Sequence, residues 1–461
     1  MDETRWSEQE FGAANLGDAR RTNRLVAMGA RAAENPAGTI TAVFCDAAER
    51  EAAYRFVENE GVEATQITAA AARAAAARAI GEAFVFVPCD GSSLNVSDDD
   101  GAKRLGRVGT RKANAQGLQV MTAIGIAADE TPLGILGQVY WTRERSGPRK
   151  KDSRNKRSVE DKETIHWLTI MKQAERAISD EAPSTRLWFQ MDRGADAWPV
   201  LRTAVEAKHW ITVRASWDRR LVTTDEHQRY LWETMQQAPL RGAYTLAVPT
   251  LADGKRAART ALMTVRAAEV TLDLIAKPSE THLATRLWAV WVSESGSCPE
   301  GEDPIEWMLL TNFPVVDFAA AQLVVRGYTQ RWRIEQFHRT WKSGACRIED
   351  TLLEDRDHII IWAALQASVA LRIVRLTYLA RHRPEEPATT ELTRHEVDAA
   401  ILVSRTKKFH RGDRLTIAQA VLLIAQCGGY TGKSSGGPAG ALVLARGLAK
   451  IQTVAIVLEE L

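Results

Sequence analysis

The sequence predicts an α/β protein in which a central part that contains the strands is flanked by helical N- and C-terminal regions. Three observations predict this fold class: residues 1–66 carry apolar side chains at helical spacing, residues 84–310 contain short apolar runs of strand length, and residues 391–461 return to helical spacing. The chain has 461 residues, 45% apolar and 26% charged, which is typical of globular proteins and excludes collagen-like and wholly disordered chains. A chain of this length is expected to form about three domains.

The individual elements follow from the apolar runs and from the turn residues between them. Helices are expected at residues 14–33, 51–57, 68–80, 159–179, 318–342, 355–379 and, interrupted by 428–440, at 391–461. Strands are expected at residues 84–87, 118–126, 133–141, 186–191, 210–214, 244–248, 261–265, 287–292 and 307–310. Pro384 and Pro387 end the helix before them and indicate a domain boundary.

Composition excludes several classes of protein. The 60 lysines and arginines nearly balance the 58 acidic residues, so the net charge gives no indication of a nucleic-acid partner. The five cysteines lie far apart without a CxxC pair, which argues against a disulfide framework or a zinc knuckle. The N-terminal residues are polar, unlike a signal peptide, and the best apolar segment, 359–371, is too short to span a bilayer. A cytoplasmic location and no membrane partner are expected.

Two acidic residues follow apolar runs of strand length, Asp90 after 84–87 and Asp192 after 186–191. Catalytic groups commonly lie at the carboxyl edge of such strands. Taken singly, each residue is equally well explained as an ordinary turn aspartate, so the pair alone does not establish a site.

The string YTQRWRIEQFHRTWK at 328–342 adds a third acidic candidate. In a regular helix Tyr328, Arg331, Glu335 and Lys342 fall within one wedge of about 60°. A solvated amphipathic helix with Arg–Glu pairing is the alternative interpretation, but the string has a separate apolar face. Its polar face is therefore a candidate for a functional role.

This string resembles the Tyr-Arg-Glu-Lys signature of the DDE transposases of the insertion-sequence-four family, and within that family it is most similar to the transposon-five type. The resemblance continues, in the same order, along nearly the whole chain. It is carried by LGDARRTNRLV (16–26), AAYRFVEN (52–59), CDGSSLN (89–95), MDRGADAWPVL (191–201), EWMLLTNFPV (306–315) and IAQCGGYTGKSSGGP (424–438).

The resemblance implies a domain organisation and a catalytic centre. It implies a helical DNA-end-binding domain at 1–66, an RNase H-like DDE catalytic domain at 67–380 with a β-rich insertion at about 218–300, and a helical C-terminal dimerisation domain at 381–461. Asp90, Asp192 and Glu335 would hold two Mg²⁺ or Mn²⁺ ions, for which carboxylates are suitable ligands in phosphodiester chemistry.

The resemblance also implies DNA contacts. Tyr328, Arg331, Lys342 and Arg214 match positions that bind phosphates at the transposon end. Trp307 and Trp332 match positions that hold a base flipped out of the duplex, although Trp307 could equally be a core residue of a strand. Candidate contacts in the N-terminal domain are Arg20, Arg21, Arg24 and Arg55.

Local charge favours a DNA partner where the net charge does not. Residues 103–112 hold five basic residues and no acidic one, and residues 143–157 hold eight basic and two acidic residues. Such clusters can neutralise phosphates, although solvated loops often have the same composition. The segment GGYTGKS at 428–434 has the wrong spacing and context for a P-loop.

The resemblance therefore implies a bacterial, nucleoid-associated cut-and-paste DNA transposase. It would bind inverted repeats in double-stranded DNA, cleave through a hairpin, join 3′-OH ends to target DNA and work as a homodimer on paired ends. Two alternatives remain: a metal-dependent nuclease of the same fold that does not transpose, and a non-catalytic DNA-binding remnant.

Overall fold

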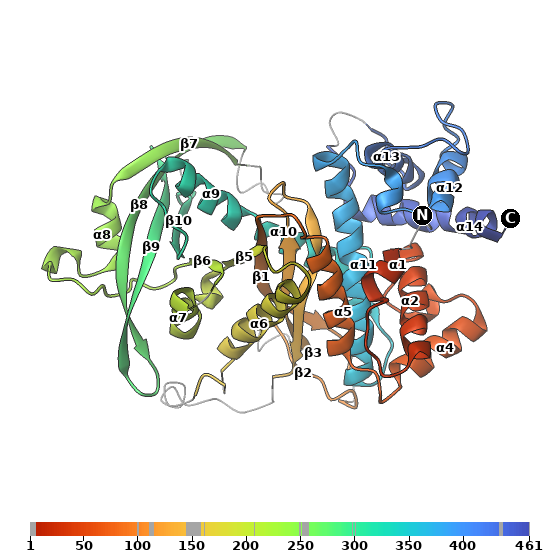
Figure 1. The fold of residues 1–461 in the computed structure, drawn as a ribbon, viewed down its shortest axis with the longest axis horizontal. Coiled ribbons are helices and arrows are strands. Elements are labelled where there is room, and N and C mark those ends of the chain that lie inside the picture. The colour runs from red at the N-terminus through yellow and green to blue at the C-terminus, as the bar shows by residue number, and fades with distance from the viewer. Residues whose placement is uncertain are drawn as a thin grey trace.

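The computed structural model describes most of the chain, and every statement below concerns these residues. They are 6–98, 101–109, 115–143, 158–160, 162–206, 208–248, 250, 258–296, 298–299, 301–432 and 437–460. Within them one large mixed sheet lies at the centre, with helical regions at both chain ends (Figure 1).

One half of the sheet consists of strands in the order β4, β3, β1, β5, β6. Their bounds are β1 Phe84–Asn95, β3 Gln116–Ile126, β4 Pro132–Trp141, β5 Arg186–Met191 and β6 Trp210–Arg214; the short β2, Gly106–Arg107, pairs with β3. Strands β1, β5 and β6 are parallel, and β3 and β4 form an antiparallel meander beside β1. The predicted bounds of β5 and β6 and the predicted meander are confirmed.

The sheet continues into a long antiparallel ribbon. After β6 come β10 (Glu306–Thr311), β9 (Thr281–Ser295), β8 (Arg259–Ala276) and β7 (Leu240–Val248). In Figure 1 these strands lie at the left, away from both chain ends, with α8 (Leu231–Gln237) beside them. Strands β7 to β9 are longer than the short runs predicted, because alternating rather than continuous apolar residues extend them.

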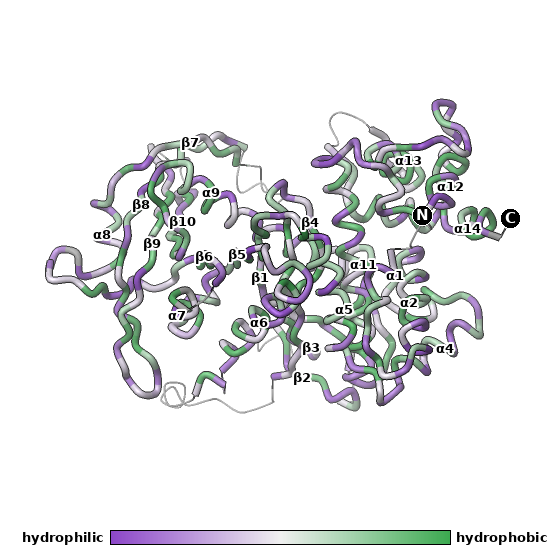
Figure 2. Tube along the Cα trace, viewed as in Figure 1, coloured by the Kyte–Doolittle hydropathy of each residue, from purple (hydrophilic) through white to green (hydrophobic). Residues whose placement is uncertain are grey.

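Alternating side chains of the central strands supply two separate cores. Val87 and Phe189 face the first core, which is covered by α5 (Ala64–Ala77) and α6 (Thr164–Glu181). Phe86 and Trp188 face the second, which is covered by α10 (Trp332–Lys342) and α11 (Arg356–His382). Because side chains along a strand alternate between the two faces of the sheet, consecutive residues face different cores. Figure 2 shows hydrophobic segments along these central strands.

The helices of the two terminal regions lie on one side of the sheet (Figure 1). The N-terminal ones are α1 (Trp6–Phe11), α2 (Ala19–Glu34), α3 (Ile40–Val43) and α4 (Ala47–Val57); the C-terminal ones are α12 (Arg394–Ser404), α13 (Ile417–Cys427) and α14 (Ala441–Glu460). Asp18 and Asp46 cap α2 and α4 by accepting hydrogen bonds from backbone N–H groups. The remaining α-helices are α7 (Trp198–Glu206) and α9 (Phe318–Thr329).

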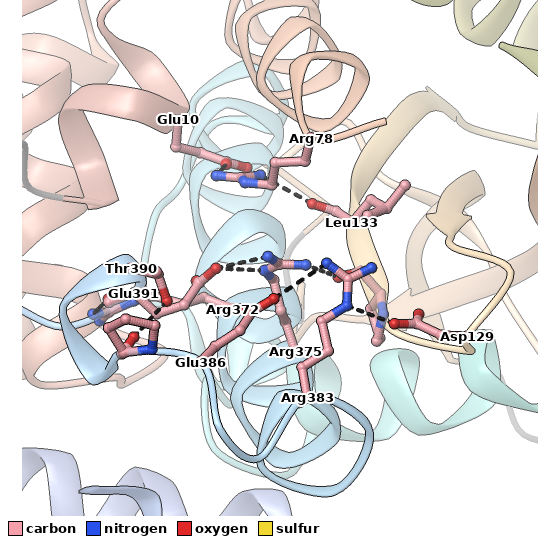
Figure 3. Close-up of polar contacts among 12 residues, drawn as sticks. Glu10, Arg78, Asp129, Leu133, Arg372, Arg375, Arg383, Glu386, Thr390 and Glu391 are labelled. Carbon is pink, nitrogen blue, oxygen red and sulfur yellow. Dashed lines mark hydrogen bonds and ion pairs between the residues drawn. The ribbon is translucent and has the colours of Figure 1, made fainter. Parts of the chain in front are cut away.

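Arginine–carboxylate pairs fasten these terminal regions to the β3–β4 hairpin; we call them the junction network (Figure 3). Arg78 of α5 pairs with Glu10 at 2.9 Å and donates to the backbone oxygen of Leu133 at 3.0 Å. Arg375 of α11 pairs with Glu391 at 2.7 Å. Arg383 pairs with Asp129 in the hairpin turn at 2.5 Å. Arg383 also pairs with Glu82 at 3.4 Å and with Glu386 at 3.5 Å.

The apolar segment predicted at 359–371 proves to be part of a helix of 27 residues, α11, so the prediction that it is too short to span a bilayer was wrong. Two helices, α11 and α14, are long and apolar enough to cross a membrane by length and composition. Of the apolar window in α11, 94% is buried inside the fold, whereas 39% of that in α14 is buried. Packing against both terminal regions and β4 explains why α11 is apolar on all sides.

Two further predictions need correction. The helix predicted at 318–342 is two helices, α9 and α10, with Gln330 and Arg331 between them, so the angular wedge calculated for one regular helix does not apply. Strand β1 runs to Asn95, so Asp90 lies inside the strand and not at its end. Beyond Cys89, β1 loses its partner β5 and stays paired with β3 alone.

Candidate active site and DNA-binding groove

Asp90 and Asp192 lie side by side at the edge where two parallel strands stop pairing. Cys89 of β1 is in register with Met191 of β5, so the two aspartates are the next residues on neighbouring strands. The Asp90 side chain accepts a hydrogen bond from the Gly91 N–H at 2.8 Å. Asp192 accepts one from the Gly194 N–H at 2.7 Å and caps the 3₁₀ turn Arg193–Ala195. The sheet therefore fixes both carboxylates without using up their oxygens.

Glu335 lies on α10, and its side chain approaches the same edge of the sheet. Arg331, at the start of that helix, bridges the carboxylates: its Nη1 donates to Asp90 Oδ2 at 3.1 Å and its Nη2 to Glu335 Oε1 at 2.7 Å. The Arg331 side chain is only 13% exposed. Its Nε has no hydrogen-bond partner within the part of the chain that the structure describes. Asp90 therefore lies near both Asp192 and Glu335, and their joint catalytic role stays a prediction.

The electrostatics of this cluster are unbalanced. Burial raises the pKa of Asp90 to about 6, the charge of Asp192 adds to this shift, and Arg331 opposes it. Burial alone lowers the pKa of the Arg331 guanidinium, but Asp90 and further neighbours outweigh it and the pKa is raised. Among the described residues, ion-pair contacts to the three carboxylates come from Arg331 alone. The carboxylates of Asp90 and Glu335 therefore share one cation, and Asp192 adds a further negative charge beside Asp90.

The three carboxylates are chemically suitable ligands for divalent metal ions. Carboxylate oxygens are hard ligands of the kind Mg²⁺ and Mn²⁺ prefer, and the uncompensated negative charge requires a cation. The geometry is not that of an assembled metal site: no group of three His, Cys, Asp or Glu side chains in the described ranges is placed to hold an ion together. The guanidinium of Arg331 lies between Asp90 and Glu335 instead.

Other residues predicted to contact DNA extend the site from Arg331. Tyr328 is 4% exposed; burial raises its pKa, and the charges of Arg331 and Arg214 oppose this. Arg214 also donates to the backbone oxygen of Glu306 at 2.9 Å. The ring of Trp307 is half-buried, with its centroid 6.1 Å from that of Tyr328. The phenol is therefore part of the frame that orients two arginines.

Trp332 and Lys342 lie on α10 itself. Trp332 is 60% exposed, and the Arg331 guanidinium stands 5.6 Å from its ring centroid. Lys342 donates to the Ser92 hydroxyl at 3.3 Å and lies 3.5 Å from Glu349. An exposed tryptophan and a lysine thus flank the carboxylates, although α9 and α10 are not one helix.

The four arginines predicted in the N-terminal region converge on one groove between α2 and α4. The groove has a volume of about 660 Å³, and its lining includes Arg20, Arg21, Arg24 and Arg55. Arg20 and Arg55 form exposed ion pairs with neighbouring acids, whereas Arg21 donates to the backbone oxygen of Leu16 at 3.0 Å. We call this surface the arginine groove.

The two basic clusters predicted from the sequence are only partly described. Residues 110–112 and 144–157 lie outside the described residues. Of the described members, Arg104 forms an ion pair with Asp355, and Arg143 donates two hydrogen bonds to Glu163 at 2.5 and 2.7 Å. These two arginines are neutralised by carboxylates.

One positioning group gives no signal in the sequence. Glu130, at the tip of the β3–β4 hairpin, accepts from Arg326 of α9 at 3.2 Å and from Arg333 of α10 at 2.8 Å. It therefore holds both sides of the break that carries Arg331. Its left-handed backbone, with φ 73°, marks a turn but is not apparent from the residue type.

Helix α13, in the C-terminal region to which the resemblance assigns dimerisation, packs mainly within its own chain. Leu415, Val421 and Ala425 are buried, and α13 contacts α11, α12 and α14. Leu422 is 45% exposed. The described surface of α13 therefore offers a small apolar area to a partner.

Two protein families match this chain. Residues 3–62 match the family described as transposase DNA-binding, and residues 170–371 match the family described as transposase DDE domain. The first match covers the arginine groove. The second covers Asp192 and Glu335, while Asp90 precedes it. Together the two matches span more than half of the chain, and the chain belongs to the DNA-binding transposases with a DDE catalytic domain, in the arrangement of the insertion-sequence-four and transposon-five type.

Proposed function

We propose that the protein is a cut-and-paste DNA transposase that binds inverted repeats at transposon ends, cleaves them through a hairpin and transfers the 3′-OH ends to target DNA. The observation that carries this proposal is the convergence of Asp90, Asp192 and Glu335 at one sheet edge with a single shared arginine. We interpret the strand order β4, β3, β1, β5, β6, with the last three parallel, as an RNase H-like core.

Asp90, Asp192 and Glu335 are the residues that would hold two Mg²⁺ or Mn²⁺ ions. When bound, two such metal ions would activate the attacking oxygen and stabilise the leaving oxygen of the phosphodiester. Arg331 holds the carboxylates of Asp90 and Glu335 close to each other. The Gly91 and Gly194 N–H groups fix Oδ1 of Asp90 and of Asp192, and Asp90 Oδ2 accepts from Arg331.

The DNA contacts divide between two surfaces. The arginine groove would bind the end sequence, because four guanidiniums along one groove can neutralise successive phosphates. Near the carboxylates, Arg331, Arg214, Lys342 and Tyr328 would hold the phosphates at the cleavage site. Trp332, exposed beside Arg331, is suited to stack on a displaced base, and Trp307, which packs against Tyr328, is the second candidate.

The domain roles follow from this division. Residues 1–66 would bind DNA ends, residues 67–380 would cleave, with the insertion at about 218–300, and residues 381–461 would pair two protomers on DNA. A homodimer is proposed because joining two ends needs two active sites. The site of action would be the bacterial nucleoid in the cytoplasm.

Two alternatives use the same residues. A metal-dependent nuclease would nick DNA without joining ends, and a non-catalytic remnant would only bind DNA. The presence of all three carboxylates, two of them paired with Arg331, argues against the remnant.

The experiment supplies the protein with its own substrate. DNA flanking the gene is sequenced, and matched inverted repeats are placed on a labelled donor fragment. Donor, target plasmid and Mg²⁺ are then incubated with the protein. Donor ends joined to the target are the expected product. Nicked donor without joined product identifies the nuclease, and binding without nicking identifies the remnant.

A further inference from the structure

A second cavity lies beside the carboxylates, on the face of the sheet opposite α10. Its volume is about 470 Å³, within the range of ligand pockets. We call it the Trp141 pocket. Its lining includes Ser92, Ser93, Gln119, Met121, Trp141 and Trp167.

Strand register builds this pocket next to both aspartates. Ser93, Gln119 and Trp141 are direct neighbours on β1, β3 and β4, so they point to the same side, the one that α6 covers. Gly91, the residue after Asp90, also lines the pocket. Trp167 of α6 lies 3.3 Å from where a Cβ on Gly194 would be, two residues after Asp192. The pocket therefore opens beside the catalytic edge.

The polar chemistry of the pocket is incomplete. Gln119 is 7% exposed, and its amide nitrogen Nε2 has no acceptor among the residues that the structure describes. A buried donor of this kind favours an occupant that carries an acceptor. The guanidinium of Arg143, at the rim of the pocket, donates one hydrogen bond to each carboxylate oxygen of Glu163. The wall is therefore close to neutral and is not suited to a phosphate.

The apolar chemistry of the pocket is aromatic. The Trp141 ring stacks on His166, with centroids 3.9 Å apart and planes at 21°, which fixes its orientation. Trp167 is 7% exposed and packs into the core below. A flat ligand with a π-face and a carbonyl oxygen matches these walls and the free amide of Gln119.

We propose that the Trp141 pocket receives a nucleobase unstacked from the DNA strand that passes the active site. This inference rests on the proposed function, because the DNA is what brings the base to the carboxylate edge. The pocket is separate from Trp332 and Trp307, which lie with Tyr328 and Arg331 on the α10 side of the sheet. The protein would thus hold bases on both sides of the cleaved phosphate.

The test uses a short duplex with one bulged 5-iododeoxyuridine, because an unpaired base is the least costly to unstack. The full chain is irradiated with this duplex, and crosslinked peptides are identified by mass spectrometry. Crosslinks to Trp141 or Trp167 are expected. Trp141→Ala should lower this crosslinking about tenfold, since stacking on one aromatic ring changes binding by that order. Trp141→Phe, which keeps a ring, should retain most of it.

Gln119→Leu, which keeps the size and removes the donor, should lower crosslinking without changing the melting temperature. It also provides the decisive variant if Trp141→Ala does not fold. Trp217→Ala is the matched control, because Trp217 is an exposed tryptophan that is not in the pocket lining; its loss should leave the crosslinks unchanged. Glu335→Gln should also leave them unchanged.

Crosslinks confined to Trp332 and Trp307, or equal crosslinking yields in Gln119→Leu and the wild type, would overturn the assignment of the Trp141 pocket as a nucleobase site. Mg²⁺-dependent nicking of the same duplex separates this failure from failure of the proposed function. If nicking persists while crosslinks miss the pocket, only the pocket assignment is wrong. If the wild type neither binds nor nicks the duplex, both proposals are wrong.

Discussion

The active site and the junction network contain the same kinds of side chain in different proportions. At the junction, Arg78 and Arg375 each pair with one carboxylate, and Arg383 pairs with Asp129, Glu82 and Glu386 (Figure 3). At the active site, Arg331 pairs with Asp90 and Glu335, and among the described residues Asp192 has no cation of its own. Matched charges stabilise a fold, whereas an excess of one sign is retained where a further charged ligand is to bind.

The pKa values of two aspartates show this difference directly. Burial raises the pKa of both. At the junction, hydrogen bonds from Arg383 and from the Thr131 N–H outweigh burial, and the pKa of Asp129 is lowered. At the active site, Asp192 adds to burial, and the pKa of Asp90 rises to about 6. One carboxylate is compensated by its own chain, and the other is not.

The largest expected effect is on cleavage. Asp90→Asn, Asp192→Asn and Glu335→Gln should each reduce nicking of an end-containing duplex to background. Each variant removes a carboxylate that would hold a metal ion at the active site. A gel shift should show DNA binding close to that of the wild type, since the arginine groove is untouched. Nicking at the wild-type rate by any one of the three variants would exclude that residue from the catalytic centre.

The next largest effect is on stability at the junction. Glu391→Gln leaves the guanidinium of Arg375 buried without its partner, and we expect a loss of about 3–5 kcal/mol in the free energy of unfolding, measured with urea. The folded fraction should still nick DNA. Arg55→Ala breaks the exposed pair with Glu51 and is the control, with an expected loss of about 0.5 kcal/mol or less. Equal losses for the two variants would contradict the assignment of the junction as a stabilising network.

The third effect concerns the arginine groove. Arg24→Ala should weaken binding of all duplexes alike and reduce the dependence of log K on log salt by about 1, because one phosphate contact is lost. Filter binding over a range of salt concentrations measures both quantities, and nicking at saturating protein should be unchanged. A salt dependence equal to that of the wild type would show that Arg24 does not contact a DNA phosphate.

The smallest effect distinguishes the two networks by sign. Without divalent ions, Asp90→Asn should raise the free energy of unfolding by about 1 kcal/mol, since it relieves repulsion by Asp192 and the cost of burying a charge. Asp129→Asn at the junction should lower it by a similar amount. Thermal denaturation of both variants measures the signs, and a loss of stability in Asp90→Asn would show that the active-site carboxylates are compensated after all.

The sequence allows prediction of those parts of the site that depend on regular elements. Continuous apolar runs define β5 and β6, and their parallel pairing with β1 then brings Asp90 and Asp192 together. The break between α9 and α10 could not be predicted, because neither Gln330 nor Arg331 disfavours a helix. Tertiary contacts cause it: Glu130 holds Arg326 and Arg333, and a Cβ on Gly327 would lie 2.7 Å from the Phe86 ring.

Other features depend on contacts between segments far apart in the chain. The bridge from Arg331 to Asp90 joins residues on different elements, and the Trp141 pocket requires three strands in register with α6. Burial inside the fold accounts for the apolar composition of α11. Residue type indicates which groups can act, but only packing shows which of them are neutralised.

The claim that the carboxylates form an uncompensated cation site is tested most directly by a Mn²⁺ titration followed by thermal denaturation. A ligand that binds only the folded state stabilises it by RT ln(1 + [L]/Kd), so tighter binding gives a larger rise. The account predicts that Mn²⁺ raises the melting temperature of the wild type and of the junction variant Glu391→Gln, and leaves that of Asp90→Asn unchanged. The same Mn²⁺-induced rise in Asp90→Asn as in the wild type would contradict it.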